Sequence, residues 1–162
     1  MQVRYRGEIL KTAYILVGVP GAGKSTWTEK HHTMNTMVVS TDHYIEQKAS
    51  EVMKTYSEVF AEYIQIATCH MVEDVKYATR HDFDVIWDQT NTTVKARARK
   101  LKMLQGYKKI AVVFKTPEEK ELQRRLESRP GKKIPNSIMS QMINGFVMPS
   151  KEEGFDEIMV VE

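Results

Sequence analysis

The sequence predicts a three-layer α/β sandwich in which a five-stranded, mainly parallel sheet lies between helices. Short apolar runs alternate with longer helical patterns, which is typical of parallel strands joined by helices. A glycine-rich turn, "GVPGAGKST" (Gly18–Thr26), follows the first apolar run and opens a helical segment. With 162 residues, 41% of them hydrophobic, the chain fits one domain, which we expect to span residues 1–162.

The five expected strands are short segments rich in apolar and β-branched residues. They are residues 12–19, 36–41, 83–88, 108–115 and 157–161. The first strand leads directly into the glycine-rich turn. Because the carboxyl ends of parallel strands meet at one edge of a sheet, residues just past these strands share a site.

The expected helices connect these strands. They are residues 24–32, about 42–79 with a break near Ala49–Ser50, 93–105, 117–129 and 136–146. Pro117 is expected in the first turn of its helix, where its missing N–H does no harm. Residues 130–135 form a loop. Cys69 falls inside the long helical pattern, and we expect it to be a buried apolar residue.

Composition excludes several classes of protein. The net charge of +3 and the pI of about 8.9 tolerate a polyanionic partner without requiring one. A single cysteine excludes an internal disulfide framework. No apolar run approaches the ~20 residues of a membrane span, and the first residues are not a signal peptide. We therefore expect a soluble, cytoplasmic protein without a membrane partner.

The glycine-rich turn satisfies the phosphate-loop (P-loop) pattern G-x-x-x-x-G-K-[ST] between a strand and a helix. In such a loop, backbone N–H groups and the start of the helix surround phosphate. Lys24 would then span the outer phosphates of ATP, and the Ser25 hydroxyl would bind Mg²⁺. The expected nucleotide contacts of the loop are Gly18, Gly21, Ala22, Gly23, Lys24, Ser25 and Thr26.

Two aspartates follow other strands at the same edge. Asp42 suits a base that accepts the proton of an acceptor hydroxyl in line with the γ-phosphate. The alternative is that Asp42 only caps a helix beginning at His43. Asp88 suits a residue that orders the metal and its waters, or a purely structural anchor. Gln89 follows Asp88 directly and keeps open an ATPase that activates water.

A basic segment of about residues 124–135 suits a lid over the nucleotide. Its cationic side chains are Arg124, Arg125, Arg129, Lys132 and Lys133. A lid arginine would stabilise the charge of the migrating phosphoryl group. The alternative is a solvated helix face whose cations favour the C-terminal end of the helix dipole.

Taken together, these segments resemble the kinase domain of the polynucleotide 5′-hydroxyl kinases, the nucleic-acid end-healing enzymes. The likeness rests on "GVPGAGKSTW", "STD", "DQTN", "RRLESRPGKKIP" and "MPSKEEGFDEI", in this order. It implies a P-loop kinase-type fold with a helical lid, ATP with Mg²⁺, and Asp42 as the acceptor base.

The resemblance also implies roles for further residues. Asp88 is the aspartate that orders the site, with Thr90 and Asn91 completing its turn. Arg129 is the lid arginine, and Arg125 is a second candidate. Family members often carry arginines beside the base aspartate that grip the substrate phosphate. This chain has Thr41 and Ile45 at those positions, a departure that concerns the acceptor.

The function implied is transfer of the γ-phosphate of ATP to the 5′-hydroxyl end of DNA or RNA. The alternatives are a kinase of another hydroxyl (a nucleoside, a small metabolite or a hydroxymethyl group on a modified DNA base) and a nucleotide-binding module without transfer. A nucleoside-monophosphate kinase fits less well, because residues 50–81 offer few cations to hold an acceptor phosphate.

Two surface features are compatible with nucleic acid. "KARARKLK" (Lys95–Lys102) is either a solvated helix surface or a contact to backbone phosphates. The aromatic residues of the long helical region are either a core stripe, which their spacing favours, or a stacking surface for bases. These aromatic residues are Tyr44, Tyr56, Phe60 and Tyr63.

Overall fold

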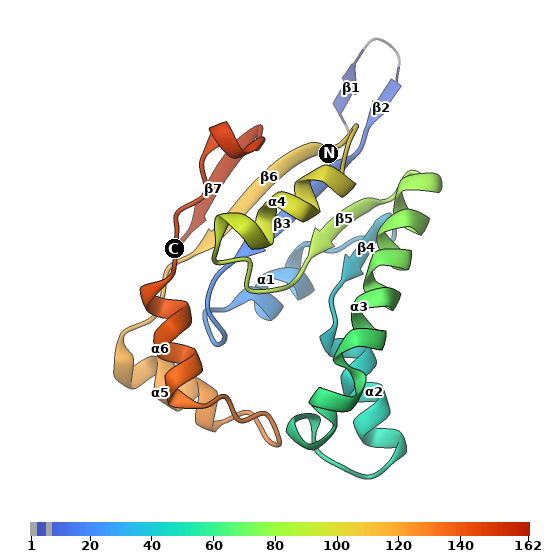
Figure 1. Ribbon diagram of the computed structural model, residues 1–162. Coiled ribbons are helices and arrows are strands. Elements are labelled where there is room, and N and C mark those ends of the chain that lie inside the picture. Colours follow the sequence, from blue (N-terminus) through green and yellow to red (C-terminus); the bar gives the residue numbers. More distant parts are fainter. Residues whose placement is uncertain (1–2, 6–7) are drawn as a thin grey trace.

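The molecule is built on a five-stranded sheet with the strand order β4-β5-β3-β6-β7. The computed structural model describes residues 3–5 and 8–162. The strands of the sheet are β3 (Thr12–Val17), β4 (Thr36–Val39), β5 (Asp84–Trp87), β6 (Lys108–Phe114) and β7 (Glu157–Val161). Every neighbouring pair in this sheet is parallel. The predicted fold class is confirmed, and the sheet is parallel throughout (Figure 1).

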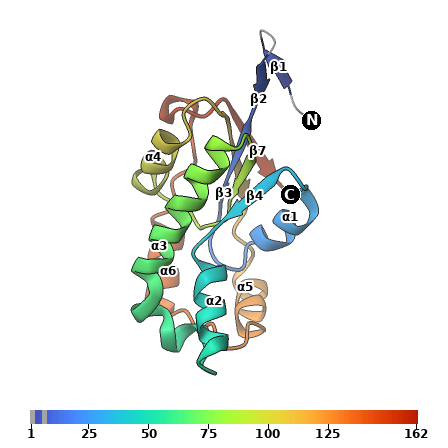
Figure 2. The ribbon, with the colours of Figure 1, turned by 90° about the vertical axis from the view of Figure 1, so that its right-hand side faces the viewer.

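Helices cover both faces of this sheet (Figure 2). Helices α3 (Tyr56–Arg80) and α4 (Val94–Met103) lie on one face, and α1 (Lys24–His31) lies on the other. The core under α3 joins Val75 to buried residues of β3 and β5. The core under α1 joins Trp27 to buried residues of β3 and β6. Burial on both faces explains why the central strands are apolar almost without interruption.

The remaining helices lie beyond the carboxyl ends of the strands (Figure 1). They are α2 (Asp42–Glu51), α5 (Glu119–Glu127) and α6 (Asn136–Asn144). A short 3₁₀ turn, η1 (Lys151–Glu153), precedes β7. The loops after β3, β4 and β5 therefore open toward α2 and the α5–α6 hairpin.

Strands β3 and β4 each end two residues before their predicted ends. The chain leaves the sheet there because its backbone N–H groups find other partners. The N–H of Gly18 donates to the carbonyl of Thr90 at 2.9 Å, and the N–H of Asp42 donates to Ser40 Oγ at 3.0 Å. The remaining strand ends in this sheet lie within one residue of prediction.

The predicted helix break is present, but it lies at residues 52–55, a few residues after Ala49–Ser50. Helix α2 continues to Glu51, and α3 begins at Tyr56. The start of α3 is fixed by a capping box: Thr55 Oγ1 accepts from the N–H of Glu58 at 3.3 Å, and Glu58 Oε2 accepts from the N–H of Thr55 at 2.7 Å. This exchange satisfies two backbone donors at the helix start.

Helix α5 also begins later than predicted. Pro117 lies before the N-cap residue Glu118 and outside the first turn. Glu118 has extended backbone angles, so helical geometry starts only at Glu119. Helices α1, α4 and α6 agree with their predicted ranges to within two residues at each end.

The prediction for Cys69 is wrong, because its side chain is exposed. Helix α3 buries Ala67, Met71 and Val75 at a four-residue spacing. Cys69 lies two residues from both Ala67 and Met71, about half a turn away, and therefore faces outward. In the described part of the chain, no helix combines the length and apolarity needed to cross a membrane.

A separate two-stranded hairpin was not predicted. Strands β1 (Val3–Tyr5) and β2 (Glu8–Leu10) pair antiparallel. The hairpin projects from the end of the molecule opposite α2, α5 and α6 (Figure 1). Three-residue strands interrupted by charged residues carry too little periodicity to be distinguished from a loop.

Candidate active site

The P-loop connects β3 to α1 in a conformation suited to an anion. Gly23 is the N-cap residue of α1, with a φ of 106° and no side-chain cap. A Cβ at Gly23 would meet nothing within 4 Å, so the glycine is required by its backbone conformation and not by lack of space. The first N–H groups of α1 are thus left without a side-chain acceptor, and they are available to a phosphate.

Lys24 folds back over this loop. Its Nζ donates to the carbonyls of Gly18 and Val19, each at 2.9 Å. Burial lowers the pKa of Lys24 to about 8; Asp88 and Asp42 oppose this effect, and Arg129 strengthens it. The amine therefore lies within an electrostatic cluster that contains both predicted aspartates.

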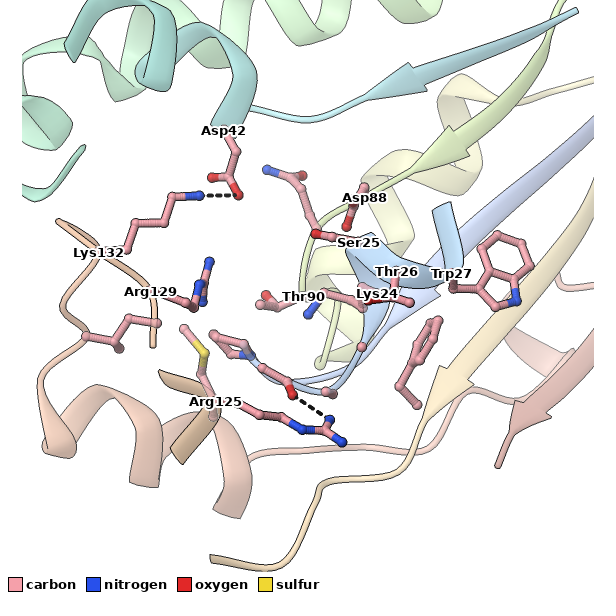
Figure 3. A pocket seen from close by; sticks show the side chains of 18 of the residues that line it. Lys24, Ser25, Thr26, Trp27, Asp42, Asp88, Thr90, Arg125, Arg129 and Lys132 are labelled. Atoms are coloured by element: carbon pink, nitrogen blue, oxygen red, sulfur yellow. Dashed lines mark hydrogen bonds and ion pairs between the residues drawn. The ribbon is translucent and has the colours of Figure 1, made fainter. Parts of the chain in front are cut away.

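Asp88 lies just past β5, close to α1. The Thr28 hydroxyl is 3.4 Å from Asp88 Oδ2. Burial raises the pKa of Asp88, the nearby Lys24 opposes the rise, and Asp42 adds to it. Ser25 is exposed and lines the same cavity, and Figure 3 shows its hydroxyl near Asp88.

The oxygen atoms of Ser25 and Asp88 fit a magnesium ion whose other ligands are substrate phosphates and waters. Among the residues that the structure describes, no group of three His, Cys, Asp or Glu side chains could hold a metal ion by itself. One hydroxyl (Ser25) and one nearby carboxylate (Asp88) match the way Mg²⁺ binds beside substrate phosphates, where it keeps several waters.

Asp42 is the first residue of α2, and its carboxylate points into the cavity (Figure 3). The helix begins at Asp42 itself, with Thr41 as its N-cap residue, so the alternative of a cap for a helix starting at His43 is wrong. Tyr56 donates its hydroxyl to Asp42 Oδ1 at 2.6 Å. Lys132 Nζ lies 3.5 Å from Asp42 Oδ2.

The two candidate lid arginines occupy different environments. Arg125 Nη1 donates to the carbonyl of Gly21 at 3.0 Å, and its Nε donates to Glu121 Oε1 at 2.8 Å. Arg125 therefore ties α5 to the P-loop. Arg129 extends into the cavity between the lid loop and the P-loop (Figure 3). Of the two, Arg129 remains the candidate for the predicted contact to a phosphoryl group.

A single cavity of about 1360 Å³ joins these elements. It exceeds the roughly 300–1,000 Å³ of ordinary ligand pockets and leaves room for two substrates. Its lining includes most of the predicted set: Gly21, Ala22, Gly23, Lys24, Ser25, Thr26, Asp42, Asp88, Arg125 and Arg129. Gly18 is not part of the lining, because it is buried beneath the loop.

Asn91 ties the turn after β5 to the end of β3, in addition to completing that turn. Its Nδ2 donates to the carbonyl of Leu16 at 2.7 Å, and its backbone carbonyl accepts from Arg97 Nη1 at 2.9 Å. Lys100 Nζ donates to Asn91 Oδ1. Asn91 has a φ of 49°, which asparagine tolerates better than most residues.

Neither alternative for "KARARKLK" describes Arg97 and Lys100. Arg97 is fully buried and forms a two-pronged ion pair with Glu153, at 2.8 and 3.1 Å. Glu153 belongs to the "MPSKEEGFDEI" segment, whose Phe155 is buried in the main core. This segment therefore supports the Asn91 turn and does not contact the cavity. Lys95 and Arg99 are exposed, as a solvated helix surface requires.

The aromatic residues of α2 and α3 divide into two groups. Tyr44, Tyr56 and Tyr63 pack against the core between these helices, in agreement with the core-stripe prediction. Phe60 is 41% exposed and lines the cavity, as the stacking alternative requires, and Tyr56 lines the cavity as well. The partnership of Tyr56 with Asp42 was missed, since no local pattern indicates it.

The fold and this cavity define a P-loop protein with a kinase-type phosphotransferase fold. Residues 14–149 match the protein family described as AAA domain. Because the match covers most of the chain, the chain belongs to this family.

Curated relatives are similar over nearly the whole chain. Heterogeneous nuclear ribonucleoprotein U-like protein 2 from Mus musculus is 29% identical over 156 residues. The Homo sapiens protein of the same name is 29% identical over 154 residues. Each match covers 89% of this chain but 20% of the relative. The chain thus spans about a fifth of the length of the curated relatives it matches.

Several solved structures share the fold. A chain of the Pnkp1/Rnl/Hen1 RNA repair complex has a TM-score of 0.66 and 24% identity, covering 84% of this chain and 44% of that one. A candidate kinase from Chloroflexus aurantiacus j-10-fl has a TM-score of 0.71 and 16% identity, covering 93% and 84%. A gluconokinase from Sinorhizobium meliloti 1021 has a TM-score of 0.55 and 16% identity, covering 94% and 82%.

These matches confirm the P-loop kinase-type fold. The first agrees with the predicted resemblance to polynucleotide 5′-hydroxyl kinases.

Proposed function

We propose that the protein is an ATP-dependent kinase that phosphorylates the 5′-hydroxyl end of DNA or RNA. The observation that carries this proposal is the position of Asp42. Its carboxylate projects into the cavity that also contains Lys24 and Ser25 of the P-loop. A kinase needs such a carboxylate opposite the phosphate site, because the acceptor hydroxyl must be oriented as it loses its proton.

The proposed reaction is a direct transfer of the γ-phosphoryl group from ATP to the acceptor hydroxyl. The acceptor oxygen forms a bond to the γ-phosphorus while the bond from that phosphorus to the β,γ-bridging oxygen breaks, and ADP leaves. The hydroxyl proton passes to the Asp42 carboxylate and then to solvent. Since the transition state is loose, Asp42 acts chiefly by orienting the alcohol.

The P-loop and the lid would hold the donor. Backbone N–H groups at the start of α1 and the Lys24 amine would bind the phosphates, and Arg129 would neutralise charge on the migrating group. Ser25 would hold Mg²⁺, with Asp88 ordering its waters; the ion would offset the negative charge of the β- and γ-phosphates. Arg125 would keep α5 against the P-loop through Gly21.

The polynucleotide acceptor is supported by the sequence resemblance and by the likeness to a chain of an RNA repair complex. A second candidate is a small hydroxyl compound. Thr41 and Ile45, the residues beside Asp42, are buried and uncharged, so α2 supplies no cation there for an acceptor phosphate. The likeness to a gluconokinase is compatible with that candidate.

One labelling experiment separates these functions. The protein is incubated with Mg²⁺ and γ-labelled ATP, in parallel with 5′-hydroxyl DNA and RNA oligonucleotides, nucleosides, small sugar acids and DNA bearing hydroxymethyl bases. We expect label at the 5′ end of an oligonucleotide, and we expect an oligonucleotide that already carries a 5′-phosphate to remain unlabelled.

Each other outcome points elsewhere. Label on a base or a small molecule would replace the acceptor and leave the kinase chemistry in place. Label released only to water would identify an ATPase. Tight ATP binding without turnover on any acceptor would identify a nucleotide-binding module.

A further inference from the structure

A lysine of the lid lies against the proposed base. Lys132 Nζ is 3.5 Å from Asp42 Oδ2 and 2.5 Å from Glu46 Oε1. It also lies 4.5 Å from the centre of the Tyr56 ring. The Lys132 side chain is 16% exposed, although it belongs to a surface loop. Figure 3 shows it reaching from its loop to Asp42.

Helix α2 contributes negative charge to this side of the cavity. The side chains of Asp42 and Glu46 are 45% and 50% exposed, one helical turn apart. Lys48, farther along α2, pairs with Glu51 instead. An acceptor phosphate placed beside Asp42 would therefore be repelled by α2 unless a cation from another element were present.

The lid loop is docked where it can supply that cation. The N–H of Ser57 donates to the carbonyl of Gly131 at 3.1 Å, and the N–H of Lys133 donates to Ser57 Oγ at 3.0 Å. Gly131 has a φ of 72°, and a Cβ there would lie 3.0 Å from Thr55 Cβ. These contacts hold the loop on the first turn of α3. They thereby place Lys132 beside Asp42, Glu46 and Tyr56.

We propose that Lys132 binds the acceptor phosphate that follows the attacked hydroxyl, and so makes the enzyme prefer nucleotide ends to nucleosides. This inference rests on the proposed function. When the acceptor binds, its hydroxyl donates a hydrogen bond to the Asp42 oxygen that Lys132 contacts in the free protein. The acceptor phosphate then pairs with the ammonium group of Lys132. Tyr56 keeps its hydrogen bond to Asp42 and holds the carboxylate in place during this exchange.

A merely structural Lys132 would act differently. If Lys132 only orients Asp42, its loss lowers transfer to every acceptor by the same factor. If it binds the acceptor phosphate, its loss matters only when that phosphate is present. A comparison of one nucleoside with its 3′-monophosphate, which differ by this group alone, separates the two roles.

The experiment measures kcat/KM for both acceptors with wild type, Lys132→Met, Lys132→Arg and a control, Lys120→Met. Lys120 is an exposed lysine of α5 that does not line the cavity. With Lys132→Met we expect a loss of about tenfold or more on the 3′-monophosphate, as for a lost charged hydrogen bond. On the nucleoside we expect a change of about twofold or less. Lys132→Arg should restore the preference, and Lys120→Met should match wild type.

The failures of this inference and of the proposed function are distinguishable. Equal losses on both acceptors, or none on either, would overturn the role of Lys132 while leaving a polynucleotide kinase. Failure of the wild type to phosphorylate the 3′-monophosphate and any 5′-hydroxyl oligonucleotide would overturn both.

Discussion

At Lys24, burial opposes the charge that a phosphate-binding residue needs. Burial lowers the pKa of this amine to about 8. Two carbonyl acceptors, on Gly18 and Val19, are its hydrogen-bond partners in the loop. Phosphates of a bound nucleotide favour the ammonium form, so the pKa of Lys24 must be higher in the complex than in the free protein.

ATP affinity should consequently decrease as pH rises. The complex keeps a proton that the free protein releases above about pH 8, so affinity is full below that value and falls as pH rises through it. Titration calorimetry with ATP from about pH 7 to 9.5 measures this fall. Lys24→Met should bind more weakly at neutral pH and show a flat profile. An unchanged profile in Lys24→Met would assign the titration to another group.

At the residue scale, the sequence predicted which residues line the cavity better than it predicted the partners of those residues. The P-loop residues, Asp42, Asp88 and Arg129 could be located because each follows a strand or a helix in a recognisable pattern. The contacts of Tyr56 and Lys132 with Asp42 could not be predicted. These residues lie 14 and 90 positions from Asp42 and meet it only through the packing of α3 and the lid.

At the element scale, helix α4 shows why a charge pattern alone is ambiguous. "KARARKLK" alternates basic and apolar residues, so the pattern does not indicate which cations face inward. The structure buries Arg97 with Leu101, one turn apart, against the sheet. Arg97 then needs a buried partner, which Glu153 of η1 supplies.

Removing one member of this pair should destabilise the protein strongly. Arg97→Met leaves Glu153 without its cation and the Asn91 carbonyl without its donor. We expect a loss of about 3–5 kcal/mol in the free energy of unfolding, measured by urea titration. The double variant Arg97→Met with Glu153→Gln should recover part of that loss.

Arg99→Met is the matched control, because Arg99 is an exposed arginine of the same helix. It should change the free energy of unfolding by no more than about 0.5 kcal/mol. Similar decreases in the free energy of unfolding for Arg97→Met and Arg99→Met would show that the buried ion pair does not stabilise the protein more than an exposed arginine does.

Element boundaries were less predictable than element types. The apolar runs were sufficient to locate the strands, because parallel strands buried on both faces are distinctive. The α2–α3 break was misplaced, since it depends on the capping box of Thr55 and Glu58 rather than on Ala49–Ser50. Strand ends at the site were misplaced because loop hydrogen bonds replace those of the sheet.

At the scale of the whole molecule, strand order brings the site together. The order β4-β5-β3 places the loops carrying Asp42, Asp88 and Lys24 side by side at one edge of the sheet. The lid crosses from α5 to α6 and docks on α3 through Ser57. The P-loop, α2 and the lid therefore belong to separate parts of the chain and share one cavity.

Binding of a 5′-hydroxyl oligonucleotide should show a moderate salt dependence. Two lysines of the loop between α5 and α6, Lys132 and Lys133, line the cavity and could contact the phosphates of the proposed acceptor. Two phosphate contacts by single-stranded substrate correspond to a slope of about −1.4 for log K against log salt. Fluorescence anisotropy between about 50 and 200 mM salt should show a loss of about sevenfold. A flat response would favour a small uncharged acceptor, and a slope several times steeper would require a longer binding surface.

A single-turnover comparison of wild type with Asp42→Asn tests whether the carboxylate at this position orients the acceptor. ATP affinity should change by less than about threefold, because Asp42 does not belong to the P-loop. Transfer to the hydroxyl should fall by about 10²-fold or more, as expected on loss of a general base. Transfer at the wild-type rate, with ATP bound normally, would contradict the placement of Asp42 at the reacting hydroxyl.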